Sequence, residues 1–107
     1  MASRRVYERN DKEAPTHSFD TGAAWMSLAL QAHSLGLITH GMQGFDQGQA
    51  RTTLALPDVY DLPALIAVGH PGDVTSLTED YQSREVPSDR KPLTEIFFAG
   101  NFRELDT

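Results

Sequence analysis

Two glycines, Gly41 and Gly44, lie close together in the stretch LGLITHGMQGFDQGQA, residues 35–50, between two segments with helical patterns. Glycine lets another molecule approach the main chain closely. A turn that enters a helix at Asp46 also presents unpaired N–H groups, which can donate to a ring nitrogen or a carbonyl oxygen. The alternative is a turn that only reverses the chain. From the spacing alone, both interpretations stay open, and the stretch is a candidate ligand contact.

A second candidate is the basic dipeptide Arg90–Lys91, with Arg84 nearby. A guanidinium group offers a forked pair of donors for a phosphate, although most charged pairs are only solvated surface. The net charge of the chain is −6. Such a surface argues against non-specific binding to nucleic acid or to an anionic membrane, which requires clustered Lys and Arg. We therefore expect a local anion site and neither a nucleic-acid nor a membrane partner.

Other common chemistries find no support in the residue types and spacings. The four histidines, His17, His33, His40 and His70, are far apart, and the sequence contains no cysteine, so no metal site is predicted. No G-x-S-x-G motif is present to hold a strained serine nucleophile. Neither a G-x-G-x-x-G fingerprint nor a P-loop occurs. These patterns therefore predict neither a metal site nor a serine hydrolase nor a Rossmann-type or P-loop nucleotide site.

The elements that position the glycine stretch follow from hydrophobic patterning. Residues 3–9 predict a short strand or an extended arm, followed by a polar loop over residues 10–18. Asp20 or Thr21 is expected to cap a long helix that ends at Gly36. This helix is apolar on almost every side, so we expect it to be buried on several sides.

The rest of the chain shows shorter elements. Asp46, with Gln49 three residues on, predicts the start of a second helix that Pro57 ends. Residues 64–69 form an apolar run typical of a buried strand, and Thr78 is expected to cap a short helix. The tail carries an apolar patch at Ile96, Phe97, Phe98 and Phe102.

Strands are scarce in this pattern. One firm strand and one short arm do not make a stable sheet, so the missing strands are expected from a partner chain. The long helix, which a chain of 107 residues can hardly cover alone, leads to the same expectation. No apolar window approaches the ~18 residues of a membrane span, and no secretion signal is visible, so a cytoplasmic location is expected.

Three stretches, taken together, resemble the C-terminal half of the nitroreductase family of FMN-dependent oxidoreductases: DTGAAWMSLALQAHSLGLITHGMQGFD, ARTTLALPDVYDLPALIAVGHPGD and SREVPSDRKPLTEIFFAGNF. They contain a helix opening on D-x-G-x-A, a turn ending in G-F-D, an A-x-I-A-x-G-x-P strand and an R-x-P-L tail. The order and spacing agree with the family from about Phe19 to Phe102.

The resemblance implies a nitroreductase-like α+β fold, with helices around a small mixed sheet and an intertwined homodimer. Residues 1–18 would form an N-terminal strand and loop, and residues 19–107 the C-terminal portion of the domain. Family members are considerably longer, because an N-terminal half supplies further phosphate-binding and ring-contacting segments. We therefore expect a truncated member of the family, assembled as a homodimer or with a complementing chain.

The resemblance also implies a cofactor and a reaction. Gly41, Met42, Gln43 and Gly44 would lie beside the ring of FMN, and Arg90 would bind its phosphate. NADH or NADPH would donate a hydride, which the flavin passes to a nitroaromatic, quinone or enal-type acceptor; the cofactor carries this chemistry, so no catalytic side chain is needed. The alternative is a non-catalytic remnant that acts as a dimerisation or complementation module.

Overall fold

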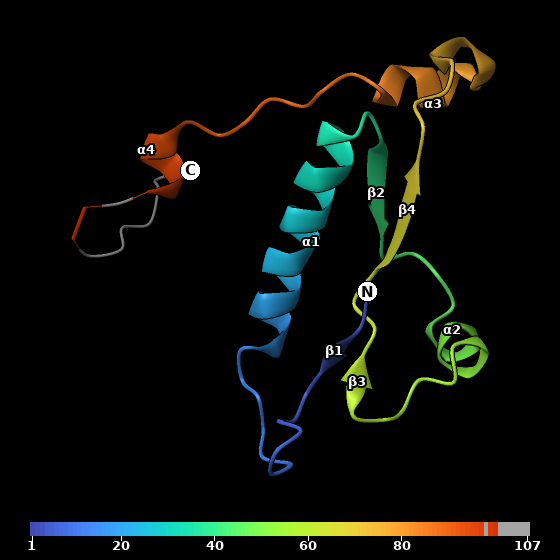
Figure 1. Cartoon of the computed structure of the whole chain (residues 1–107). Helices are drawn as coiled ribbons and strands as arrows, with labels where there is room; N and C mark the ends of the chain where they lie inside the picture. The colour runs from blue at the N-terminus through green and yellow to red at the C-terminus, as the bar shows by residue number, and fades with distance from the viewer. Residues whose placement is uncertain (98, 101–107) are drawn as a thin grey trace. The chain divides into compact units, whose positions relative to one another are not determined.

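The computed structural model describes residues 1–97, 99 and 100, and the chain divides into two compact units, Met1–Pro71 and Gly72–Thr107 (Figure 1). Helices and strands alternate in the first unit, which confirms the predicted α+β class. Its elements are β1 (Ser3–Arg4), α1 (His17–Ser34), β2 (Ile38–Met42), α2 (Gln47–Thr53), β3 (Tyr60–Asp61) and β4 (Leu65–Gly69). The expected division after residue 18 stays a prediction, and the strand expected within residues 3–9 is present as β1.

The start of α1 lies at His17, before the predicted cap at Asp20 or Thr21. The Thr16 carbonyl accepts from the Asp20 N–H at 2.9 Å, and the Thr16 hydroxyl donates to the Asp20 carboxylate at 3.2 Å. Asp20 thus lies in the first turn, where a negative charge is favoured by the helix dipole. The predicted cap was wrong because an acidic residue stabilises a helix from inside the first turn as well as from the cap.

The end of α1 confirms the role expected of Gly36. Its φ is +74°, in the left-handed region that glycine tolerates best. The Gly36 N–H donates to His33 O at 3.0 Å, and the Leu37 N–H donates to Ala32 O at 2.9 Å. These two bonds form a Schellman motif, which satisfies carbonyls at the helix end and turns the chain into β2.

Each predicted strand pairs with a strand that the sequence pattern did not reveal. β4 confirms the strand expected at residues 64–69, and it pairs antiparallel with β2, placing Gly41 opposite Ile66. β1 pairs antiparallel with β3. The predicted mixed sheet is therefore two antiparallel pairs among the described residues. Each of these sheets has two strands, both from this chain, and further strands from a partner chain stay a prediction.

α2 begins as predicted and ends early. The Asp46 carboxylate accepts from the Gln49 N–H at 2.8 Å, which confirms the cap. The helix ends at Thr53 and not at Pro57, because Ala55 takes a φ of +48° and closes a second Schellman motif, in which the Leu56 N–H donates to Arg51 O at 3.0 Å. An alanine in this conformation gives no sequence signal, which explains the error.

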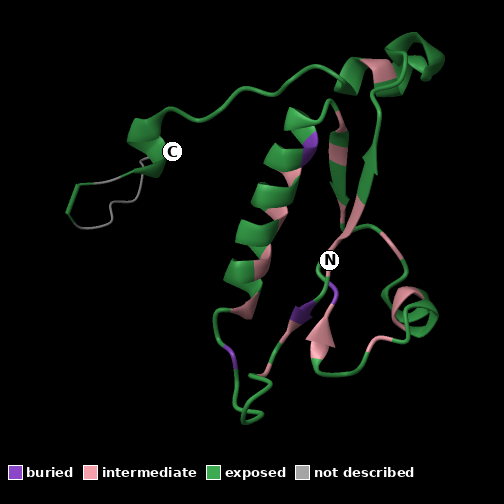
Figure 2. Ribbon diagram, in the orientation of Figure 1, coloured by how far each residue is buried: buried purple, intermediate pink, exposed green. Residues whose placement is uncertain are grey.

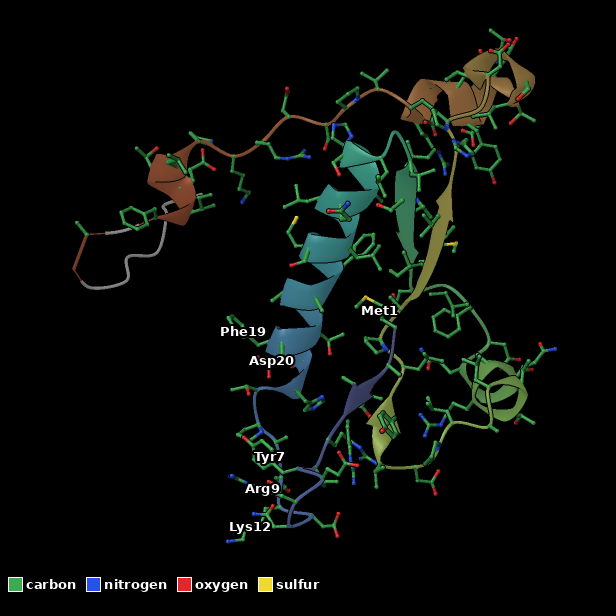
Figure 3. The ribbon with its side chains drawn as sticks, viewed as in Figure 1. Met1, Tyr7, Arg9, Lys12, Phe19 and Asp20 are labelled. Atoms are coloured by element: carbon green, nitrogen blue, oxygen red, sulfur yellow. The ribbon has the colours of Figure 1, made fainter. Side chains whose placement is uncertain are left out.

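One side of α1 is covered in this chain (Figure 2). Ala32 is buried, and Thr21, Trp25 and Ala29 are half-buried. The other apolar side chains are exposed, among them Phe19, Met26, Leu28, Leu30 and Leu35. Phe19, which is 77% exposed, projects from the side of α1 away from the strands (Figure 3). The expected burial on several sides is not provided by the described residues of this chain.

The second unit contains a 3₁₀ helix (Val74–Ser76), α3 (Glu79–Arg84) and α4 (Leu93–Ile96). α3 begins after Thr78, as predicted. Hydrogen bonds from the hydroxyl and the N–H of Thr75 lower the pKa of the Asp73 carboxyl below its ordinary value. Ile96 and Phe97 of the predicted apolar patch are exposed, whereas Phe98 and Phe102 lie outside the described residues. Across the described parts of both units, no helix is long and apolar enough to cross a membrane.

Candidate functional site

A hollow of ≈ 330 Å³ opens in the first unit between the N-terminal half of α1, the end of β2 and the segment that leads into β4. This volume lies within the range of small-molecule pockets, roughly 300–1,000 Å³. The lining residues are Met1, Ser18, Thr21, Gly22, Trp25, Gly41, Met42, Gln43, Pro63, Ala64 and Ile66. Three of the five residues predicted from the sequence are therefore brought together here.

The wall at the end of β2 depends on the packing of Trp25 over Gly41. A Cβ atom placed on Gly41 would lie 3.5 Å from Cζ2 of Trp25 and 3.6 Å from Cδ1 of Ile66. These are ordinary contact distances, so Trp25 and Ile66 pack close to the backbone of Gly41. Gly41 thus allows the Trp25 ring to lie directly against the strand.

The backbone beyond β2 has free donors beside this wall. Within the described residues, the N–H groups of Gln43 and Gly44 donate to no main-chain or side-chain acceptor. Both residues are exposed, and the Gln43 carbonyl accepts from the Phe45 N–H at 3.0 Å. A Cβ atom on Gly44 would meet nothing within 4 Å. These two amides are therefore available to a ligand that enters from the hollow.

The second wall comes from α1 and was missed by the sequence analysis. Ser18, Thr21, Gly22 and Trp25 follow the i, i+3, i+4, i+7 spacing that places residues on one helix face. The Thr21 hydroxyl donates to His17 O at 2.7 Å. The available signal was that three small residues at helical spacing lead to the single tryptophan of the chain.

The other predicted residues stand apart from the hollow. Gly44 follows Gln43 in the chain and is not among the lining residues. Arg90 belongs to the second unit, where its Nη1 donates to the Ser88 carbonyl and hydroxyl oxygens, both at 2.8 Å. The role of Arg90 in the same site stays a prediction.

A serine, a histidine and an aspartate also meet in the first unit. Ser3 Oγ and His17 Nδ1 are hydrogen-bonded at 3.0 Å, and His17 Nε2 lies 3.9 Å from Asp61 Oδ2. Ser3 is only 5% exposed, and the histidine–aspartate distance is too long for a hydrogen bond. The cluster therefore joins the start of α1 to β1 and β3 and is not arranged for hydrolysis. Among the described residues no group of three or more side chains is placed to hold a metal ion.

The hollow suits a flat, partly polar ring. The Met1 ammonium, which donates to Ala64 O at 2.6 Å, is the charged group in this lining, and Trp25, Met42 and Ile66 provide apolar surface. The unpaired amides next to it supply donors for ring nitrogen and oxygen atoms, while the glycine backbone leaves space for close approach. The chemistry of these residues fits the isoalloxazine ring of a flavin.

Comparison with known proteins assigns the family. The sequence pattern of the nitroreductase family matches residues 1–70, which include both walls of the hollow. The chain belongs to the nitroreductase family. The match begins at residue 1. It therefore includes residues 1–18, which precede Phe19, the start of the resemblance found in the three sequence stretches.

A solved structure and two curated proteins are similar to the chain. The structure, titled "The crystal structure of the oxidoreductase containing FMN", has a TM-score of 0.88 and 42% identity, covering 95% of this chain and 53% of that chain. A Mycolicibacterium smegmatis protein described as an "Uncharacterized 15.4 kDa protein in ask 5'region" is 33% identical, over 87% of this chain and 63% of that protein. An "NADH dehydrogenase" of Thermus thermophilus is 36% identical, over 64% of this chain and 30% of that protein. The chain thus spans less than two thirds of each of these proteins.

Proposed function

We propose that this chain forms the flavin-contacting portion of an FMN-dependent NAD(P)H oxidoreductase. The observation that carries the proposal is the hollow lined by Gln43, together with the unpaired amides of Gln43 and of Gly44, the next residue in the chain. The 42% identity to a structure whose title names FMN supports the choice of ligand. Gly41, Met42, Gln43 and Gly44 would contact the ring, and Arg90 would bind the phosphate.

The residues of this chain would bind and orient the cofactor and would not perform the bond-breaking step. When bound, a flavin supplies hydride transfer between a reduced nicotinamide and an acceptor. The Gln43 and Gly44 N–H groups would donate to the ring edge, where their fixed dipoles favour negative charge. Trp25 and Ile66 would keep water from the ring, and the Arg90 guanidinium would offset the phosphate charge.

The proposed reaction uses NADH or NADPH as donor and a nitroaromatic, quinone or enal-type compound as acceptor. Support for the donor comes from the Thermus thermophilus relative, which is named as an NADH dehydrogenase. The proposal places the protein in the cytoplasm and in an assembly with a second copy or with a complementing chain.

Flavin retention by the Gly44→Val variant tests the proposed site. The new side chain would enter open space in the protein, so the fold should be unchanged, but it would crowd the approach of a ring to the amides. We expect FMN affinity to fall at least about tenfold, or ~1.4 kcal/mol, in a titration followed by flavin absorbance. Gly69→Val is the matched control, because a Cβ atom there also meets nothing within 4 Å. Equal FMN affinity in both variants would show that the turn is only structural, and a wild-type chain that cannot be loaded with FMN would refute the proposed function.

The Arg90→Ala variant tests the phosphate contact. Loss of a charge-assisted hydrogen bond should weaken FMN binding by about 1.5–3 kcal/mol, roughly 10- to 150-fold. Binding of riboflavin, which lacks the phosphate, should be unchanged. Arg84→Ala is the control, since Arg84 pairs with Asp80 at 3.2 Å on α3 and should leave both affinities unaltered. If FMN affinity survives the loss of Arg90, that residue does not belong to the site.

The second candidate function, a non-catalytic dimerisation or complementation module, is favoured by a different observation. Leu30 is 64% exposed and Met26 is 56% exposed on α1, and Phe19 extends the same apolar surface. Large exposed apolar surfaces commonly mark protein interfaces.

Association can be measured independently of flavin. We expect sedimentation to show a dimer or a larger species, because burial of this surface removes apolar area from water. Leu30→Lys should shift the equilibrium toward monomer, whereas Val86→Lys, on the other unit and also exposed, should not. A folded wild-type chain that stays monomeric would contradict the expected partner. An association that persists in a chain unable to hold FMN favours the module over the enzyme.

A further inference from the structure

The outer edge of β4, the edge that does not face β2, is open. β4 (Leu65–Gly69) pairs with β2 in a sheet that has two strands among the described residues (Figure 1). Outside that pairing, no main-chain group of residues 65–69 is hydrogen-bonded to another described main-chain group. Val68 is 52% exposed, and Ala67 and Gly69 are exposed as well. The edge therefore presents unpaired N–H and C=O groups, which can pair with another strand.

This edge lacks the features by which proteins usually prevent strand pairing, namely charged side chains, prolines and bulges. No Lys, Arg, Asp or Glu lies between Asp61 and Asp73, and no proline interrupts residues 64–70. The register with β2 is continuous along the strand, so β4 has no bulge. β2, by contrast, contains Gly41 in its interior, and a glycine there weakens a strand. β4 is thus the edge of this sheet that favours an added strand.

The prolines on either side of β4 favour a second copy of this chain as the source of that strand. Proline has no N–H group to donate to a ladder. Pro63 and Pro71 each lie four residues from Ala67. If two copies of β4 pair antiparallel about a two-fold axis at Ala67, a proline therefore faces a proline at both ends, and every residue between them has a partner. Such pairing also closes, because each copy uses the same edge.

The side chains are compatible in this register. Ala67 lies opposite Ala67 of the second copy, so two small side chains meet at the axis. Ile66 lies opposite Val68 of the second copy, and β-branched side chains pack well against their neighbours on a sheet. Each copy carries a net charge of −6, but the edge itself has no charged side chain, so no like charges face each other directly across it.

We propose that the outer edge of β4 is a self-association surface, at which two copies of this chain join their two-stranded sheets into one sheet in the order β2–β4–β4–β2. A sheet of two strands is marginal by itself, and added strands stabilise it. The inference goes beyond the proposed function and needs no flavin. It also differs from association through the apolar surface of α1, because main-chain hydrogen bonds between two strand edges hold the copies together.

Disulfide trapping tests this register directly, because the chain contains no cysteine. Ala67→Cys places a thiol at the axis, where opposing Cα atoms of an antiparallel pair lie about 4.5–5.5 Å apart, within the range that a disulfide spans. His40→Cys is the matched control, since His40 is also exposed and pairs with Ala67 but lies on β2. Both variants of the full chain are also made together with Leu30→Lys, which weakens association through α1.

We expect Ala67→Cys in a glutathione redox buffer to form a disulfide-linked dimer at least about tenfold faster than His40→Cys, with or without Leu30→Lys, as read on a non-reducing gel. A second measurement uses no cysteine. In the Leu30→Lys chain, Ala67→Lys should raise the dimer Kd at least about tenfold in sedimentation, because two like charges would face each other at the axis. His40→Lys should leave the Kd unchanged.

Three results would overturn the proposal. The first is equal trapping of the two cysteine variants, or no trapping of Ala67→Cys. The second is trapping that disappears with Leu30→Lys, which would assign the association to α1. The third is a co-purifying polypeptide that prevents the cross-link of Ala67→Cys, which would make a complementing chain the occupant of the edge. FMN titration of the same variants reports on the proposed function separately, so the failure of one does not imply the failure of the other.

Discussion

The contact of Trp25 with Gly41 holds the site together. It brings the N-terminal half of α1 against the end of β2, with the indole Cζ2 3.5 Å from the place of a Gly41 Cβ atom. Because the contact is made, the helix face with Gly22 and the strand end with Gln43 face the same hollow. The two glycines of this stretch thus differ in their surroundings. Trp25 and Ile66 pack close to Gly41, whereas no atom lies near the place of a Gly44 Cβ, so the main chain there is accessible.

The small core explains why binding matters for this unit. Only Ala14, Ala32 and Leu62 are buried apolar residues among those described, while much of α1 remains exposed. A small chain buries a low fraction of its surface, so its stability is modest. A ligand or partner that binds only the folded form adds stability in proportion to the logarithm of its concentration over its Kd. A flavin in the hollow and a second chain on α1 would therefore each stabilise the same helix, from opposite sides.

Local signals in the sequence predicted several elements correctly, especially where a single residue determines the end of a helix. Gly36 closes α1, Asp46 caps α2, and the apolar run at residues 64–69 forms β4. β2 and β3 were not predicted, because their sequences are short and contain glycine or aspartate, which are uncommon in strands. Both strands form by pairing with segments that are distant in the sequence. Of the residues that the resemblance indicated, Gly41, Met42 and Gln43 line the hollow, and their role in flavin binding stays a prediction. The α1 wall depends on which helix face packs on β2. That choice is made by tertiary contacts, and so Trp25 could not be assigned to the site from the pattern alone.

The central claim is that the Gln43 and Gly44 amides, unpaired within the described protein, donate to a bound flavin ring. Amide hydrogen exchange of these two residues, measured with and without saturating FMN, tests it most directly. The account predicts fast exchange in the free protein and at least about tenfold slower exchange at both amides once FMN is bound, because a hydrogen-bonded amide must open before it exchanges. Bound FMN with both amides still exchanging at their free rates would contradict it.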